Sequence, residues 1–396
     1  MEYKALYEAC KEIYNSNTIK TQSDFLKHYY NLNDLYKRYT YNDNEYMPLF
    51  FELNEINNGK CLHTTNELYD IYSISMSDFA NKDRSYSNDA NKYKQSVQIK
   101  NMIQYKYKCE NVTTAWIKMY EILEKCNILS DYDISNVLDV FFICELPGAF
   151  IFALNHFIKT KTEIKYRWFA QSLNPKKRDD VFDDKFGLVQ NYANNYDFGP
   201  NDGDITKTEN ISYYEKKYKS DLVISDCGWD ASDDFIKQEK NLIGLLKAEI
   251  MLGLKILKSR GNFIFKSYTF FTDEMRDLLW ILYNSFKSVI VTKPISSKKF
   301  SNETYIICKE FKGYNPSSLI STISDIFSNN CNKCNETFIY KRLYLNMMDL
   351  LKDKYWNLFD NNTIKILTDE KNIVITNFIT KLNLKNISDN DRLIKR

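Results

Sequence analysis

Short apolar runs and amphipathic stretches alternate along the middle of the chain. Six runs have the length and the β-branched and aromatic content of buried strands: 136–144, 165–170, 221–226, 262–266, 288–292 and 305–309. Four further stretches have the pattern of helices: 113–129, 150–157, 237–259 and 272–286. Thr113 or Thr114 has the side chain to cap the first helix, and Gly261 is expected to end the third. This alternation predicts an α/β domain between about residues 111 and 313.

The two ends of the chain have a different pattern. Residues 1–104 are polar and rich in Tyr and Asn, with several short amphipathic stretches, and 81–101 has the Lys, Asp, Ser and Asn content of a loop or linker. From residue 314 the pattern becomes helical again, with Asn-rich breaks. We therefore divide the chain into a helical N-terminal region (1–104), an α/β domain (105–313) and a helical C-terminal region (314–396).

The overall charge argues against a general nucleic-acid-binding protein. The 396 residues include 54 Lys and Arg against 52 Asp and Glu, which gives a net charge of +2. Any contact with RNA must then come from local patches. The 30 Tyr and 25 Phe residues have side chains that stack on bases. An A/T-rich source genome, however, explains most of them as core and surface filler.

The cysteines indicate a reducing compartment. There are nine, an odd and scattered set, and Cys144, Cys227 and Cys308 lie in or beside strand-like runs, where a reduced, buried thiol is the usual state. The N-terminal residues are charged throughout and show no secretory signal, so we expect a cytoplasmic protein. The C-x-x-C of Cys331 and Cys334 has no second pair of ligands and is expected to be two free thiols, not a zinc site.

Neither a membrane span nor a metal site is expected. The most apolar stretch, 140–158, is interrupted by a glutamate, a proline and two further polar residues, whereas a span needs about 20 apolar residues. The three histidines, His28, His63 and His156, form no cluster along the chain. Metal binding and histidine-based catalysis are therefore not predicted.

Charged residues stand at the ends of the strand-like runs. Asp226 ends one run, Lys266 ends the next, and Glu303 precedes the last. Ligands of open α/β sheets bind beyond the carboxyl ends of the strands, so we expect Asp226 and Lys266 to face one crevice. Lys118 lies beside the apolar stripe of the helix 113–129, where, taken alone, it would be a solvated lysine. The alternative for the whole group is a surface network of salt bridges, which contributes little stability.

Two turns offer places for a ligand. The turn 145–149 lies between a predicted strand and a predicted helix, and its small residues let a ligand approach the backbone and the helix N-terminus. Its one glycine, Gly148, does not make a glycine-rich loop, so this motif is weak on its own. The turn 201–206 presents the carboxylate of Asp204 at its exit.

Taken together and in order, these residues resemble a known pattern. The Lys-Asp-Lys-Glu tetrad of the FtsJ/RrmJ-type RNA ribose 2′-O-methyltransferases is similar to Lys118 in TTAWIKMYEIL, Asp226 in DLVISDCG, Lys266 in GNFIFKSYTFFT and Glu303 in TKPISSKKFSNETYIICK. The segment ELPGAF resembles the loop with which the family binds S-adenosylmethionine. DGDIT and the segment around Glu303 resemble the cap-specific, Adrift-like branch of the family. The FtsJ-like methyltransferases of African swine fever-type large DNA viruses share the CELPG turn. The resemblance covers the middle half of the chain.

The resemblance implies a Rossmann-like methyltransferase sheet flanked by helices. It implies methylation of an RNA ribose 2′-hydroxyl, that of the cap-proximal nucleotide of mRNA in the cap-specific branch, with S-adenosylmethionine as the cofactor. The catalytic residues that it implies are Lys118, Asp226, Lys266 and Glu303. The cofactor-binding residues that it implies are Glu145, Leu146, Pro147, Gly148, Ala149, Phe150, Asp204, Ile205 and Asp226. The implied partner is RNA, capped mRNA in particular, beside other capping or virion subunits, and a viral source would place the protein in the host cytoplasm or the virion.

The tetrad has a physical interpretation as a device that tunes a pKa. Methyl transfer to a hydroxyl needs its oxygen held against the methyl carbon and its proton removed. Lysine, with a reference pKa of about 10.4, is a poor base unless burial or a nearby cation lowers that pKa. We expect Lys118 to be that cation for Lys266, with Asp226 and Glu303 balancing the charge.

The chain departs from the family in the cofactor loop. Phe142 and Cys144 stand where an acid and a small residue are expected, and Ala149 replaces the second glycine of Pro-Gly-Gly. Two alternatives stay open, and these changes favour the second. One is methylation of an internal ribose in structured RNA. The other is an inactive methyltransferase fold that serves as an RNA-binding or assembly subunit.

Overall fold

The described part of the chain is mainly its middle half. The computed structural model describes residues 49–52, 90–130, 132–178, 183–228, 238–268, 272–294, 296–297, 303–313 and 382–394. Most of the two end regions, which were predicted to be helical, and the pair Cys331 and Cys334 lie outside these residues.

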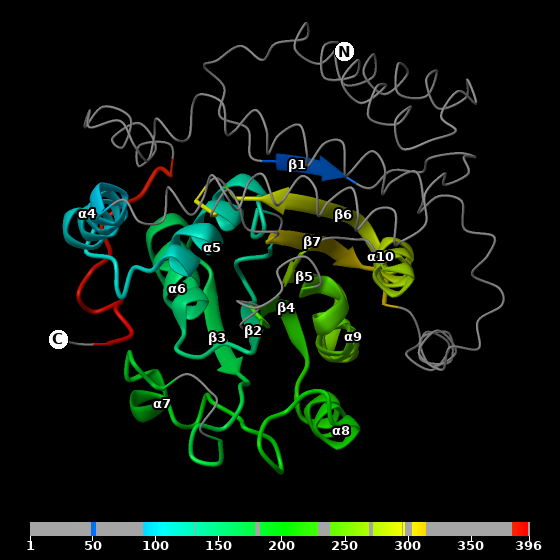
Figure 1. The fold of residues 1–396 in the computed structure, drawn as a ribbon. Helices are drawn as coiled ribbons and strands as arrows, with labels where there is room; N and C mark the ends of the chain where they lie inside the picture. Colours follow the sequence, from blue (N-terminus) through cyan, green and yellow to red (C-terminus); the bar gives the residue numbers. More distant parts are fainter. Residues whose placement is uncertain are drawn as a thin grey trace, which may run out of the picture.

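The described strands form one sheet of seven with the order β1-β6-β7-β5-β4-β2-β3 (Figure 1). The strands are β1 (Leu49–Glu52), β2 (Val137–Ile143), β3 (Lys165–Ala170), β4 (Ser220–Ser225), β5 (Leu257–Ser267), β6 (Phe286–Lys293) and β7 (Thr304–Phe311). Four neighbours, β3, β2, β4 and β5, pair in parallel, whereas β7 runs antiparallel between β5 and β6. The predicted α/β class, a Rossmann-like sheet flanked by helices, is confirmed.

Helices cover both faces of the sheet (Figure 1). They are α4 (Ala90–Lys106), α5 (Thr114–Lys125), α6 (Ala149–Lys161), α7 (Leu188–Asn191), α8 (Thr208–Lys217), α9 (Gln238–Ile256) and α10 (Asp273–Ser285). Successive side chains of a strand point to opposite faces. Leu222 and Ile224 of β4 are therefore buried with α4, α5 and α6, whereas Val223 between them is buried with α8, α9 and α10.

Several elements differ from the sequence prediction. Gly261 does not end a helix, because α9 ends at Ile256 and Leu257 already pairs with Ser220 in the sheet. The helix α4 covers half of the expected linker 81–101, because Ile99 and Ile103, one turn apart, are buried against the neighbouring helices despite the polar surroundings. The helix α8 was not predicted.

The end regions contribute to the fold where they are described. The strand β1 pairs antiparallel with β6, so the sheet extends beyond the limits expected for the α/β domain. Residues 382–394 contain turns and no helix. The carboxylate of Glu110 accepts hydrogen bonds from the backbone of Leu393 and Ile394, at 3.0 and 2.8 Å. This part of the C-terminal region is thus fastened to the central domain.

Candidate active site

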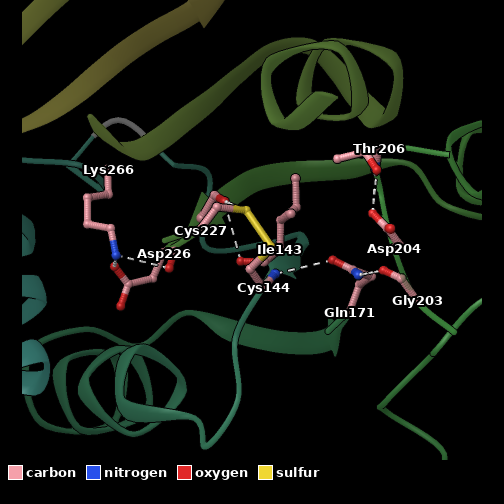
Figure 2. The surroundings of a disulfide bond; sticks show 10 residues. Ile143, Cys144, Gln171, Gly203, Asp204, Thr206, Asp226, Cys227 and Lys266 are labelled. Atoms are coloured by element: carbon pink, nitrogen blue, oxygen red, sulfur yellow. Dashed lines mark hydrogen bonds and ion pairs between the residues drawn. A yellow bond between two sulfur atoms is a disulfide. The ribbon is translucent and has the colours of Figure 1, made fainter. Parts of the chain in front are cut away.

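The carboxyl ends of three parallel strands meet at one edge of the sheet. Ile143 of β2 pairs with Ser225 of β4, and Ser225 pairs with Phe265 of β5. The next residues along each strand, Cys144, Asp226 and Lys266, therefore lie at that edge, as Figure 2 shows. This is the edge at which open α/β sheets bind ligands.

Lys266 and Asp226 form an ion pair at this edge. The Lys266 Nζ lies 2.8 Å from Oδ1 of Asp226 and donates a hydrogen bond to the Asp226 carbonyl oxygen at 3.2 Å (Figure 2). The two side chains are 12% and 23% exposed. Such a pair is less screened by solvent than an exposed salt bridge. The structure thus brings together the two residues that were expected to share a crevice.

Lys118 and Glu303 form a second ion pair. The Thr113 hydroxyl accepts a hydrogen bond from the backbone of Trp116 and begins α5, which carries Lys118. The Lys118 Nζ lies 2.5 Å from Oε1 of Glu303. Because Lys266 is paired with Tyr305 in the sheet, Glu303, two residues before Tyr305, lies at the same edge.

The segment before Glu303 is held by α5 as well. The carboxylate of Glu121, one helical turn after Lys118, accepts hydrogen bonds from the backbone N–H and the hydroxyl of Ser296, at 3.2 and 2.9 Å. The hydroxyl of Ser297 then donates to Glu303 at 3.1 Å. Sequence reasoning did not find Glu121, whose role depends on a segment 175 residues away.

The pKa of Lys266 differs from the expectation. Burial lowers the pKa of this ammonium, but the nearby Asp226 carboxylate, Tyr268 and Glu303 together more than offset burial, so the pKa is raised above its ordinary value. The expected lowering by Lys118 is wrong for this arrangement, because the charge of Lys118 is paired with Glu303. Lys266 is thus an ammonium at neutral pH.

A disulfide joins Cys144 to Cys227 between the two strand ends (Figure 2). The prediction of reduced thiols is therefore wrong for these two residues, whereas Cys308 is free and buried as expected. The bond connects the residue before Glu145 to the residue after Asp226. Its partners are 83 residues apart, and the sequence pattern does not reveal that β2 and β4 are neighbours.

The turn after β2 is packed closely against α6 and Leu188. Oε1 of Glu145 accepts a hydrogen bond from the backbone of Phe150 at 2.8 Å, in the first turn of α6. Burial raises the pKa of Glu145, and the Asp226 carboxylate adds to this. Gly148 has φ 104°, and any Cβ there would overlap Leu188. The N-terminus of α6 is thus already faced by a carboxylate of the chain itself.

The remaining residues of this turn are mostly core residues. Leu146, Ala149 and Phe150 are buried in the cluster that contains α5 and α6. The peptide bond between Leu146 and Pro147 is cis. These side chains set the path of the turn.

The turn 201–206 lies at the same edge and is linked to the turn after β2. Oδ1 of Asp204 accepts hydrogen bonds from the backbone and the hydroxyl of Thr206, at 3.0 and 2.6 Å, and Ile205 is buried. The buried Gln171 accepts a hydrogen bond from the backbone of Cys144 at 3.2 Å and donates one to the Gly203 carbonyl oxygen (Figure 2). Sequence reasoning missed Gln171, which follows the strand 165–170 directly.

Acidic side chains gather at this edge of the sheet. The carboxyl groups of Glu145, Asp204 and Asp226 lie at the strand ends with the ammonium of Lys266, and Arg178 lies 3.9 Å from Asp204. S-adenosylmethionine, the cofactor implied by the sequence, carries a sulfonium and an ammonium, which carboxylates stabilise. Among the residues that the structure describes, no group of His, Cys, Asp and Glu side chains could hold a metal ion, and no helix has the length and apolar character to cross a membrane.

Comparison with protein families gives one match that covers half of the chain. The model of the FtsJ-like methyltransferase family matches residues 112–311. This range begins just before α5 and ends with β7. It therefore contains both ion pairs, the disulfide and both turns.

Individual relatives are similar over about half of the chain. A probable methyltransferase of African swine fever virus (isolate Pig/Kenya/KEN-50/1950) is 32% identical over 226 residues, which cover 53% of this chain and 52% of that protein. The cap-specific mRNA (nucleoside-2′-O-)-methyltransferase 2 of Drosophila melanogaster is 32% identical over 223 residues, 53% of this chain and 31% of that protein. The chain thus spans about half the length of the viral relative and less of the fly protein.

A solved structure with a similar arrangement is human methyltransferase-like protein 13 in complex with SAH. It is 13% identical, the match covers 54% of this chain and 89% of that chain, and the TM-score is 0.32.

Proposed function

Because this chain belongs to the FtsJ-like methyltransferase family, we propose that it transfers a methyl group from S-adenosylmethionine to a ribose 2′-hydroxyl of RNA. The observation that carries the proposal is the pairing of Lys266 with Asp226 and of Lys118 with Glu303 at one edge of the sheet. The acceptor that we propose is the cap-proximal nucleotide of mRNA. The similarity to a cap-specific methyltransferase of Drosophila melanogaster supports this choice.

Lys266 and Asp226 have different roles toward the hydroxyl: Lys266 orients it and Asp226 accepts its proton. When bound, S-adenosylmethionine supplies an electrophilic methyl group. Lys266, held as an ammonium, donates a hydrogen bond to the ribose 2′-oxygen and orients it. The Asp226 carboxylate lies 2.8 Å from that ammonium, so a hydroxyl bound to Lys266 has a proton acceptor beside it. Asp226 would take the proton that the hydroxyl loses. The raised pKa of Lys266 is the reason that we assign the base to Asp226.

Lys118 and Glu303 act on the same site from the other side. Glu303 is among the charges that raise the pKa of Lys266, and it is itself held by Lys118 and by Ser297. We propose that this second pair fixes the charge and the position of Glu303 beside the acceptor ribose. Asp226 and Glu303 then both stabilise the ammonium of Lys266.

The cofactor would lie over the turn after β2. The backbone of residues 145–150 and the carboxylate of Asp204 at the exit of the second turn are the groups that we propose to hold it. Gln171, which bonds to both turns, sets the distance between them. Glu145 accepts a hydrogen bond from the backbone in the first turn of α6. We therefore propose that the ammonium of the cofactor, not its carboxylate, lies at the N-terminus of this helix.

One observation favours a second candidate, an inactive fold that binds RNA. The N-terminus of α6 is occupied by Glu145, and the turn around Gly148 is packed against Leu188. A chain of this kind would bind RNA and fail to bind the cofactor. Calorimetric titration with S-adenosylmethionine separates the two candidates directly.

The test of the proposed function is a paired assay. Binding of S-adenosylmethionine is measured by calorimetry, and transfer of its labelled methyl group is measured on short capped RNA, the same RNA without a cap, and a structured RNA. We expect binding, and transfer to the capped RNA above the others. Transfer to the structured RNA alone would favour an internal ribose, and the absence of both binding and transfer would reject the enzyme.

A further inference from the structure

Gly228 lies directly beside the ammonium of Lys266. A Cβ atom at this position would lie 2.7 Å from Nζ and 3.3 Å from Cε of Lys266, and 3.3 Å from the hydroxyl of Tyr268. Atoms that are not bonded to each other pack at about 3.5–4.0 Å. The space that the Lys266 ammonium occupies is therefore open because residue 228 has no side chain.

The backbone conformation does not explain the glycine. Gly228 is not among the residues with a positive φ, unlike Gly148 and Gly203. An alanine could adopt its conformation without strain. What an alanine could not do is leave the neighbouring ammonium in its place.

The position of that ammonium is defined by the short segment from Asp226 to Gly228. The Nζ atom bonds to the carboxylate of Asp226 at 2.8 Å and to its carbonyl oxygen at 3.2 Å. It therefore lies across the backbone that leads into Gly228. The hydroxyl of Tyr268, whose pKa burial raises to about 12, is uncharged at neutral pH and lies beside the same position.

We propose that Gly228 is a positioning residue of the active site, which sets the place of the Lys266 ammonium by offering it a bare backbone. The inference rests on the proposed function, because Gly228 acts through Lys266. The conflict that a Cβ creates is with the far end of a flexible side chain, so the fold tolerates it. The ammonium must then move by about 1 Å to restore an ordinary contact. A displacement of that size in an active site costs about 10²-fold in rate.

The experiment compares two alanine variants. Gly228→Ala adds a methyl group beside Lys266, and Gly244→Ala adds one on the exposed side of α9, where nothing lies within 4 Å. We expect Gly228→Ala to lower kcat by up to about 10²-fold, and by no more than Lys266→Ala does, with the dissociation constant for S-adenosylmethionine and the melting temperature close to those of the wild type. Gly244→Ala should keep the wild-type kcat. A Gly228→Ala protein with wild-type kcat would overturn the proposal.

A second measurement does not depend on activity. In protein labelled with ¹³C at lysine Cε, the Lys266 resonance is assigned by its loss in Lys266→Arg and is then titrated with pH. In Gly228→Ala the titration midpoint should move down, toward the ordinary value for lysine, because Asp226 is further away. An unchanged midpoint would contradict the proposal. This result stands even if the wild type methylates no RNA, which would count against the proposed function alone.

A double variant covers the case in which Gly228→Ala is unstable. In the Lys266→Ala background the shortened side chain no longer meets the new methyl group. Adding Gly228→Ala should then cost nothing further in stability or in residual rate, because the two residues act through one contact. Independent losses that multiply would show that Gly228 acts through something other than Lys266.

Discussion

Substitution of Lys266 by alanine removes the ammonium that Asp226 holds at 2.8 Å, in a side chain that is 12% exposed. A hydrogen bond to a charged group contributes about 1.5–3 kcal/mol, and each 1.36 kcal/mol is about tenfold in rate. If Lys266 orients the attacking hydroxyl, its loss should lower kcat by about 10- to 150-fold. The dissociation constant for S-adenosylmethionine should stay close to the wild-type value, because the lost contact is made to the acceptor.

The matched control is Lys258→Ala. Lys258 also pairs with aspartates, at 2.7 Å from Asp139 and 3.0 Å from Asp221, but at the opposite end of the sheet. The Lys258→Ala substitution removes one positive charge, as Lys266→Ala does, and should leave kcat unchanged. A single-turnover methyl-transfer assay on capped RNA measures both variants. A Lys266→Ala rate within about threefold of the wild type, far less than the loss expected for a charged hydrogen bond, would refute the reasoning.

The pH dependence separates the two roles that Lys266 could have. Its pKa is raised, so the neutral amine is scarce at neutral pH. If Lys266 were the base, kcat/KM would rise about tenfold per pH unit through the alkaline range. With Lys266 remaining an ammonium that only orients the hydroxyl, we expect no such rise in kcat/KM over the same alkaline range.

Three further predictions concern other parts of the structure. Reduction of the Cys144–Cys227 disulfide should lower the free energy of unfolding, measured by denaturant titration, by on the order of 4 kcal/mol for a loop of 83 residues. The control is Cys227→Ser, whose free energy of unfolding should be the same with and without reductant. Burial raises the pKa of Glu249 to about 8, so its proton stabilises the fold below the ordinary pKa of about 4.5 and this stabilisation is lost as pH rises to about 8. Glu249→Gln should therefore exceed the wild type in unfolding free energy at pH 8 by up to about 5 kcal/mol and match it near pH 4.5. Gln171→Ala should weaken S-adenosylmethionine binding by about tenfold in calorimetry, whereas an unchanged affinity would separate the two turns from the cofactor site.

The strands could be predicted because each carries its own signal. The run 165–170 has the limits of β3, and the runs that end at Asp226 and Lys266 lie in β4 and β5 or one residue beyond. Buried parallel strands need apolar residues on both faces, so their composition is visible in a window of six residues. Helix caps are equally local, and Thr113 accepts its hydrogen bond only three residues away.

Features that depend on distant segments could not be predicted. The two cysteines of the disulfide are 83 residues apart, and Lys118 and Glu303 are 185 residues apart. The types and order of the charged residues indicated an active site. Whether the pKa of Lys266 is raised or lowered, however, depends on which acid lies closest to it. Asp226 lies at 2.8 Å, whereas Lys118 is occupied by Glu303. The helix α8 was not predicted because only three of its residues are buried and one of these is polar, so its apolar pattern is weak.

The most direct test of the proposed function uses one atom of the substrate. Two short capped RNAs are compared that differ at the first transcribed nucleotide, which carries either a ribose or a 2′-deoxyribose. Labelled methyl transfer from S-adenosylmethionine is followed by nuclease digestion and mass spectrometry. We expect one methyl group on the first nucleotide of the ribose substrate and none on the deoxy substrate. Equal transfer to both RNAs, or a methyl group on a base, would contradict ribose 2′-O-methylation.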